Sequence, residues 1–325
     1  MNQETSWAGL GHEIAFEQFE LPVIRKKVDA VSVNRPGISV REEDGVLTME
    51  GFDFVHRFDL CKGAFTTISR HSLPLIHGPI GFSVWRAPTD NDRFVKAKWI
   101  EAGFDRAVTK VYRVDWKLEE EGSVNIQVDF SLGGYSAPNI LQGNAEWTVL
   151  ATGEITLGVK ANVKEDLMYL PRFGLQLTMP AGMEEVEYFG LGPHESYIDK
   201  RRSVKKGHYL TTVDEMFVPY IKPQENGSRF GTEWVTVSNA LGMGLRFEGD
   251  EAFSFNAGHY GMDDLAAAGH HHELVKRGET FIRLDYKMSG IGSNSCGPEL
   301  LHPYRLDEKE IEFGLRIKSV FKADE

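Results

Sequence analysis

Cysteine is scarce in this chain of 325 residues, where Cys61 and Cys296 are the only two. Two thiols do not make a disulfide framework, so we expect the fold to depend on a packed core, which a chain of this length can bury. No stretch approaches 18 apolar residues, so no transmembrane helix is expected. The first five residues have neither the basic nor the apolar segment of a signal peptide, and we therefore expect a cytoplasmic protein without a membrane partner.

Basic residues are also fewer than acidic residues. The formal net charge is -12 and the sequence pI is about 5.5. Nucleic-acid binding needs clustered Lys and Arg against the phosphates, so this composition argues against a nucleic-acid partner. The longest basic run, Lys200-Arg201-Arg202, has no aromatic stacking pattern beside it and is interpreted as a solvated loop.

Helical periodicity is rare, and alternation of polar and apolar residues dominates instead. Because successive side chains of a strand point to opposite faces, such alternation predicts strands with one wet and one buried face. Glycine-rich turns separate the runs at short intervals, which indicates an all-β antiparallel sandwich or barrel. The clearest alternating runs are residues 123–130, 154–163, 173–177 and 280–286.

Only two segments suggest helices: residues 263–268, ending at Gly269, and part of residues 92–102. Strands do not alternate with helices of 10–15 residues, as a (β/α)₈ barrel requires. Neither a Rossmann glycine fingerprint nor a Walker A loop is present. The sequence therefore lacks the common scaffolds that hold nucleotides or a barrel active site.

The first thirty residues form a separate piece. Residues 7–21 predict one or two strands, but a fragment this short cannot bury its own apolar face. Trp7, Phe16 and Phe19 are expected to be exposed unless a partner covers them. We therefore expect two parts, 1–31 and 32–325, the first of which needs a neighbour.

Polar residues gather in loops between glycines and prolines. Asp90, Asn91 and Asp92 can hold sugar hydroxyls, bind a cation or cap a helix, and their spacing does not decide among these. Glu195 and Glu225 each lie beside turn-forming residues. A glycosidase needs two carboxyl groups about 5–9.5 Å apart, so these two can form such a pair. The alternative is that each accepts loop N–H groups and an Arg, for example Arg229.

Two further features have weaker chemical meaning. Cys296 lies in a glycine-rich loop, residues 290–298, where it can act as a nucleophile, although no base is near in sequence and a packing role is favoured. The run His270-His271-His272 invites a metal interpretation. Adjacent histidines of regular structure cannot all face one ion, and the HExxH spacing is missing, so we expect no metal site on this chain.

Taken in order, these segments resemble the last domain of glycoside hydrolase family 2 β-galactosidases. The resemblance rests on five ordered motifs that cover almost the whole chain. The N-terminal piece, TSWAGLGHEIAFEQFEL at 5–21, is similar to the closing strands of the preceding domain. The motifs are WRAPTDND at 85–92, YFGLGPHESYIDK at 188–200, PYIKPQENGSRFGTEW at 219–234, FSFNAGHY at 253–260, and GIGSNSCGP at 290–298 followed by HPYRL.

This resemblance implies a fold and a role. The fold is an antiparallel supersandwich of the galactose-mutarotase-like kind over residues 32–325. Residues 1–31 would be closing strands of an immunoglobulin-like sandwich shared with a large subunit. In split members the large chain carries the catalytic barrel, so this chain resembles the small, non-catalytic subunit. The whole enzyme would hydrolyse terminal β-D-galactosides such as lactose with retention, and any Mg²⁺ or Na⁺ would lie on the large subunit.

The resemblance also assigns residues. The segment just after Asp90, Asn91 and Asp92, which runs from Arg93 through Phe94 to Lys98, matches the position of a mobile loop that closes over substrate. Cys296 occupies a position where many members place a Trp against the sugar, and Asn294 and Ser295 can contact a hydroxyl there. No catalytic residue is implied on this chain. Structural loop roles are implied for Arg86, Glu195, Tyr197, Glu225, Asn226 and Arg229.

Two other functions remain open on the same fold. A free-standing sugar mutarotase needs a Glu base and His acids in one groove, for which His194, His259, His272 and Glu299 are available. A carbohydrate-binding module without a partner is the other alternative.

Overall fold

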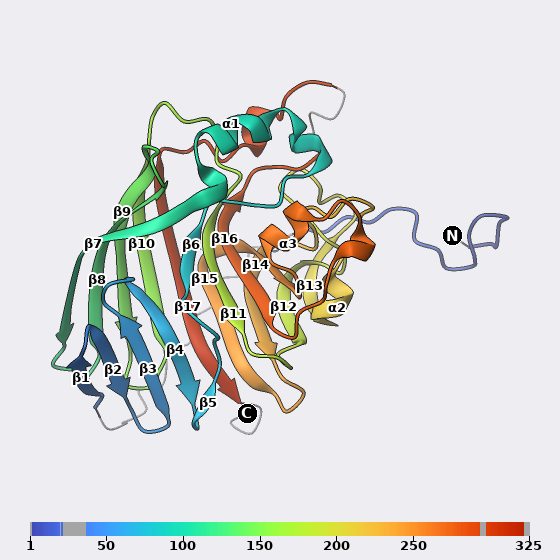
Figure 1. Ribbon diagram of the computed structural model, residues 1–325. Coiled ribbons are helices and arrows are strands. Elements are labelled where there is room, and N and C mark those ends of the chain that lie inside the picture. Colours follow the sequence, from blue (N-terminus) through green and yellow to red (C-terminus); the bar gives the residue numbers. More distant parts are fainter. Residues whose placement is uncertain (1, 20, 22–36, 293–296, 322–325) are drawn as a thin grey trace. The chain divides into compact units, whose positions relative to one another are not determined.

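The computed structural model in Figure 1 describes residues 2–19, 21, 37–292 and 297–321. The chain divides into two units, Met1–Val33 and Asn34–Glu325, and each is described by itself. Asn294, Ser295 and Cys296, which the sequence places near substrate, lie outside the described residues.

The first unit contains no strand or helix within residues 2–19 and 21. The strands predicted over residues 7–21 therefore do not form in the single chain. The physical reason is that a strand needs a neighbour for its backbone hydrogen bonds, and so short a segment cannot supply one. The predicted exposure is confirmed, because Trp7, Phe16 and Phe19 are 67%, 36% and 84% exposed.

The second unit begins with a five-stranded antiparallel sheet in the order β1-β2-β3-β4-β5. Its first hairpin turns at Asp44 and Gly45, which both have positive φ, of 51° and 74°. A two-residue turn of this kind matches the twist of the strands that it joins, and Asp-Gly is a preferred pair there. The strands are β1 (Ser39–Glu43), β2 (Val46–Glu50), β3 (Phe54–Asp59), β4 (Ala64–Arg70) and β5 (Leu73–Pro74).

A larger sheet of twelve strands makes up most of the unit. Nine of them follow the order β13-β12-β14-β15-β17-β10-β9-β8-β7, and every pair is antiparallel. The strands are β6 (Gly81–Ser83), β7 (Ala107–Leu118), β8 (Val124–Gly134), β9 (Asn139–Val149), β10 (Ile155–Val163), β11 (Arg172–Met179), β12 (Glu185–Gly192), β13 (Lys205–Thr212), β14 (Arg229–Ser238), β15 (Met243–Gly258), β16 (Thr280–Met288) and β17 (Glu310–Phe321).

The long strand β15 divides this sheet. Its first half pairs with β17, and its second half pairs with β16, which in turn pairs with β11 and through it with β6. β11, β14 and β16 each begin or end beside a motif loop, so the pairing of these strands determines where the motif loops lie. The prediction of an all-β antiparallel fold is confirmed.

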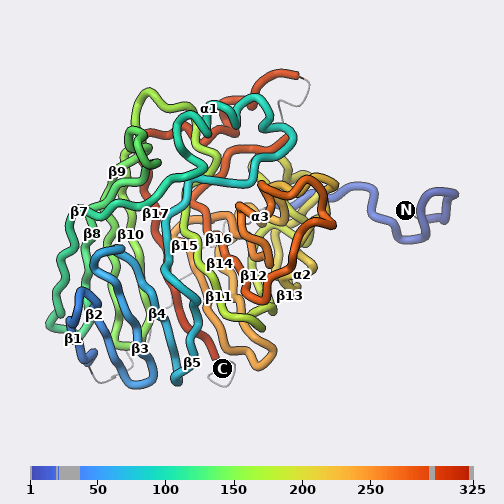
Figure 2. Tube along the Cα trace, in the orientation of Figure 1, coloured from blue at the N-terminus to red at the C-terminus, as the bar shows by residue number. Residues whose placement is uncertain are grey.

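The core extends from β2 to β17, and one part of it lies between the small sheet and the β8–β10 part of the large one (Figures 1 and 2). Trp147 of β9 meets Phe58 and Phe65 of the small sheet edge-on, with ring centroids 6.4 and 5.3 Å apart. All three side chains are buried. Rings in this arrangement add to the stabilisation that comes from burying their area.

Helices are few and short, as the sequence predicts. They are α1 (Val95–Glu101), α2 (Val213–Met216) and α3 (Met262–Ala267), with 3₁₀ turns η1 (Asp90–Arg93), η2 (Phe104–Arg106), η3 (His271–Glu273) and η4 (His302–Tyr304). None of the helices in the described part of the chain is long and apolar enough to cross a membrane.

Candidate functional site

The loop that holds Asp90, Asn91 and Asp92 forms the 3₁₀ turn η1 and is tied down by a buried ion pair. Arg86 donates from Nε and Nη2 to both carboxylate oxygens of Asp92, at 3.2 and 2.8 Å. The same guanidinium also donates to the backbone oxygens of Ser289 and Gly290. Asp92 therefore has a structural part in the site, because its carboxylate is fully engaged by Arg86 and by the N–H of Thr89.

The glycine-rich loop after β16 is fastened to the same place. Asn91 Nδ2 donates to the backbone oxygen of Ile291 at 2.5 Å. Asp199 accepts hydrogen bonds from the backbone N–H groups of Ile291 and Gly292, at 3.0 and 2.7 Å. Asp199 and Asn91 belong to motifs that precede Ile291 by about one hundred and two hundred residues. These two motifs thus hold the start of the loop that leads to Cys296.

The segment Gln224-Glu225-Asn226 completes the cluster. The N–H of Asp90 donates to Gln224 Oε1 at 2.8 Å, and the N–H of Glu225 donates to the backbone oxygen of Ala87 at 3.0 Å. Asn226 accepts from the N–H of Val218. Four motifs that are distant in sequence therefore meet in one hydrogen-bonded group of loops.

Glu195 is buried and serves this group of loops. It accepts hydrogen bonds from the N–H of Gly227 at 2.8 Å, from Lys200 Nζ at 2.5 Å, and from the Tyr220 hydroxyl. Burial alone would raise the pKa of Glu195, but these hydrogen bonds and the charge of Lys200 outweigh it and lower the pKa. Glu195 is therefore an ionised anchor of loops at neutral pH.

Glu225 is held from the other side by Arg172. The Arg172 guanidinium forms a bidentate pair with Asp285, at 2.7 and 2.5 Å, and reaches Glu225 Oε2 at 3.3 Å. Burial alone would lower the pKa of Arg172, but the two carboxylates raise it. The Arg that sequence analysis suggested for the glutamates, Arg229, instead donates to the Tyr188 hydroxyl and to the backbone oxygen of Gly227.

Charges buried in the protein interior are balanced around these loops. Isolated buried charges are very unfavourable, so each needs an opposite charge or hydrogen bonds to compensate it, as Arg229 and Arg283 receive from hydroxyl, amide and backbone oxygens. Four Arg and four carboxylates are buried among the described residues. Tyr197, also buried, places its hydroxyl 3.5 Å from the N–H of Ser228. The eight charged residues are Arg86, Arg172, Arg229, Arg283, Asp92, Glu195, Glu225 and Asp285.

A cavity of about 380 Å³ opens between the motifs. Two buried oxygen atoms on its wall, Thr89 Oγ1 and Glu225 Oε1, have no hydrogen-bond partner among the described residues. Both atoms are shielded from solvent, so ordered water would supply the donors that they lack, while the polar side chains around the cavity suit a ligand with hydroxyl groups. The wall also includes Asp90, Asn91, Lys200 and Tyr220.

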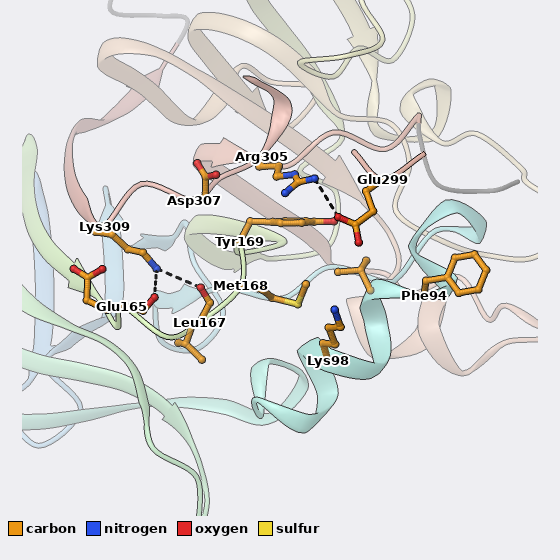
Figure 3. Close-up of a pocket in the computed structure, with 11 residues that line it drawn as sticks. Phe94, Lys98, Glu165, Leu167, Met168, Tyr169, Glu299, Arg305, Asp307 and Lys309 are labelled. Atoms are coloured by element: carbon orange, nitrogen blue, oxygen red, sulfur yellow. Dashed lines mark hydrogen bonds and ion pairs between the residues drawn. The ribbon is translucent and has the colours of Figure 1, made fainter. Parts of the chain in front are cut away.

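A second cavity, of 470 Å³, has Phe94 and Lys98 on its wall (Figure 3). Phe94 lies at its edge and is 60% exposed, with the Arg93 guanidinium 4.5 Å from its ring centre. Arg305 covers the Tyr169 ring and is paired with Glu299 at 3.3 Å. Lysines, glutamates and an aspartate thus surround an aromatic floor, which makes the cavity polar at its rim.

Helix α1 fixes the position of Phe94. Val95 and Trp99, four residues apart and so on one helix face, are both buried. The Trp99 indole N–H donates to the backbone oxygen of Tyr169 at 3.0 Å, and the Arg86 guanidinium lies 5.4 Å from the Trp99 ring centre. Phe94 is therefore an exposed apolar group held on an anchored support.

The residues considered for a mutarotase are not joined to one another. His259 is buried and its Nδ1 lies 3.0 Å from the backbone oxygen of Glu279. His272 stacks on its exposed neighbour His270, and Glu299 pairs with Arg305. Among the hydrogen bonds and ion pairs of the described residues, none links two of the four candidate groups.

Sequence reasoning missed Arg172, Asp285 and Lys200. The strand alternation suggests that Arg283 and Asp285 share one face of β16, two residues apart, while apolar neighbours occupy the other. Both faces of this strand are in fact buried. Opposite charges two residues apart, in a strand whose other residues are mostly apolar, were the available signal for a buried charge network.

A family model described as "Beta galactosidase small chain" matches residues 50–317. The chain belongs to the β-galactosidase small-chain family. The match covers β3 to β5 of the small sheet, the motif loops and nearly all of the large sheet, so the family accounts for the residues that form the candidate site.

Curated relatives carry the same name. The β-galactosidase of Actinobacillus pleuropneumoniae is 35% identical over 322 residues, which are 99% of this chain and 31% of that protein. The β-galactosidase of Staphylococcus xylosus is 33% identical over 316 residues, 96% of this chain and 31% of that protein. The chain thus spans about a third of the length of these relatives.

Similar solved structures are also found. A putative mutarotase from Salmonella typhimurium covers 93% of this chain and 97% of its own, with 13% identity and a TM-score of 0.48. A galactose 1-epimerase from Lactobacillus acidophilus covers 87% of this chain and 98% of its own, with 8% identity and a TM-score of 0.44.

Proposed function

We propose that this chain is the small, non-catalytic subunit of a β-galactosidase that hydrolyses terminal β-D-galactosides such as lactose with retention. One observation carries the proposal: the chain belongs to a β-galactosidase family yet spans 31% of the length of its relatives. The described strands are all antiparallel, so these residues do not build the parallel barrel on which a glycosidase of this family would hold two carboxyl groups.

The motif loops then complete an active site on the partner. The Asp90–Phe94 segment and the start of the 290–298 loop are tied to each other and to a buried charge network. Such support positions loops accurately, which is what a substrate rim requires. Asp90 and Asn91 face a polar cavity suited to hydroxyl groups, and Phe94 offers an exposed apolar surface to the sugar or to the partner.

The first unit supplies the contact with the large subunit. Its exposed side chains include Trp7, Leu10, Ile14 and Phe19, each more than half exposed in the single chain. Apolar groups so exposed are typical of an interface, and a segment that forms no strand in the single chain can add a strand to a neighbour's sheet. We infer that residues 1–31 complete a sandwich domain that the large subunit begins.

In this proposal Mg²⁺ and Na⁺ belong to the large subunit. Mg²⁺ and Na⁺ prefer sets of oxygen ligands. Among the described residues the one cluster of three or more His, Cys, Asp or Glu groups is His270, His272 and Glu273, and its two imidazoles do not suit these ions. A cytoplasmic location is part of the same proposal.

The test is a reconstitution of both chains with variants at the rim. We expect Phe94→Ala to lower the kcat/KM of the pair for a chromogenic β-galactoside by about tenfold, equivalent to about 1.4 kcal/mol of transition-state stabilisation. Co-elution of the chains should be unchanged. Leu118→Ala, at a similarly exposed apolar residue on β7, is the matched control and should keep full activity.

Equal kcat/KM for Phe94→Ala and Leu118→Ala would contradict the rim assignment. Failure of the chains to co-elute would contradict the subunit assignment and favour a free-standing carbohydrate-binding module.

A further inference from the structure

Three side chains gather on the exposed turn η3, which follows α3. One ligand atom from each of His270, His272 and Glu273 lies within 4.8 Å of the others. Sequence reasoning set the histidine run aside because three adjacent histidines cannot face one ion. Two of them with a glutamate can do so when the backbone turns between them.

The turn itself is fixed by backbone hydrogen bonds. The N–H of Glu273 donates to the backbone oxygen of His270 at 3.0 Å, so the two residues lie one 3₁₀ turn apart on the same side. The N–H of His271 donates to the backbone oxygen of Ile221 at 3.1 Å and joins the turn to the segment after α2. The imidazoles of His270 and His272 are nearly parallel, with centroids 5.4 Å apart and planes 22° apart.

The carboxylate is oriented by a hydrogen bond from outside the cluster. Glu273 Oε2 accepts from the N–H of Gly269 at 2.8 Å, and Oε1 lies 3.0 Å from His270 Nδ1. Glu273 is thus a ligand whose orientation is already set, as in metal sites whose carboxylates are hydrogen-bonded by their surroundings.

We propose that His270, His272 and Glu273 bind a divalent transition-metal ion of the Zn²⁺ type. Two imidazoles and one carboxylate are a ligand set that Zn²⁺ accepts, with a solvent molecule in the fourth position. Ligand atoms around tetrahedral Zn²⁺ are about 3.4 Å apart, given bond lengths of about 2.1 Å. We expect rotation of these exposed side chains to close the remaining gap from 4.8 Å without a change in the backbone. This site is separate from the motif loops and does not depend on the proposed function.

The neighbouring His271 provides an internal comparison. It lies on the same turn, is equally exposed, and meets the His272 ring edge-on at 83°. It is not part of the cluster whose ligand atoms converge. If the metal binds to this defined set of ligand atoms, His271 contributes less to the affinity than its two neighbours. Nonspecific binding of metal to exposed histidines would involve all three alike.

The test is isothermal titration of the full chain with ZnCl₂ at pH 7.5. We expect one ion per chain, a Kd that rises at least about tenfold in His270→Ala, His272→Ala and Glu273→Gln, and a Kd within about twofold of the wild type in His271→Ala. Titration with MgCl₂ should give no binding heat, because imidazole is a poor ligand for this hard ion.

Three results would overturn the proposal. The first is no zinc binding at about 0.1 mM protein, a concentration that suffices to detect a Kd in the micromolar range. The others are an equal loss of zinc affinity in His271→Ala and His272→Ala, or unchanged zinc affinity in both His270→Ala and His272→Ala. Each variant is exposed, so circular dichroism should show an unchanged fold and tie any loss of binding to the ligand itself.

Discussion

Replacing Arg172 by Met is the most informative test of how the motif loops are held. The Arg172 side chain is 1% exposed and pairs with Asp285 and Glu225, which are equally inaccessible. Methionine fills a similar length but leaves two buried carboxylates without their cation. Breaking a buried pair by removing one partner costs about 3–5 kcal/mol, and we expect the upper part of that range because two acids lose their partner.

Urea unfolding at pH 7, followed by tryptophan fluorescence, measures this loss. Trp99 and Trp147 are fully buried and report the loss of the core. The matched control is Arg41→Met, since Arg41 is an exposed cation with one weak ion pair, to Glu43 at 3.7 Å, and should change stability by less than about 0.5 kcal/mol. A loss below about 1 kcal/mol in Arg172→Met would refute the reasoning, because it would mean that water or rearranged charges replace the guanidinium at little cost.

Three further predictions concern other parts of the chain. Because the folded-state pKa of Glu195 is lowered, its stabilisation is present above the unfolded pKa of about 4.5 and is lost as the pH falls through the folded value; Glu195→Gln should therefore flatten the acid side of a urea-midpoint-against-pH curve. Gly227→Ala should cost more than about 1 kcal/mol in the same unfolding assay, because Gly227 has a φ of 74° and an added Cβ would lie 2.5 Å from a backbone oxygen, whereas Gly158→Ala, in open space, should not destabilise. Replacing Trp7 and Phe19 together by Ser should leave the melting temperature of the lone chain unchanged but weaken its association with the large subunit by at least about tenfold, measured by biolayer interferometry; an unchanged Kd would remove the first unit from the interface.

The strands could be predicted because their signal is local. The run at 154–163 alternates at every position, and β10 spans Ile155–Val163 with alternate residues buried. The short helix predicted at 263–268 is α3, at Met262–Ala267. In both cases the residues that decide the element lie within the element itself.

The site could be predicted only in part, because its contacts join distant residues. The order of the motifs indicates which loops form the site. No periodic pattern in the sequence predicts the ion pair of Arg172 with Asp285, because the two residues are 113 positions apart. The convergence of His270 with Glu273 depends on a turn stabilised by Ile221, and adjacent-residue reasoning has no access to it. The strands expected at 7–21 do not form in the described residues of the first unit, because so short a segment cannot build a sheet by itself.

In the proposed function, catalysis requires another chain. The most direct measurement is hydrolysis of a chromogenic β-galactoside by this chain alone, by the large chain alone, and by the mixture, at equal protein concentration. We expect turnover only in the mixture, with no release of chromophore above the uncatalysed rate by this chain. Sustained hydrolysis by this chain alone, abolished by Glu225→Gln, would contradict it.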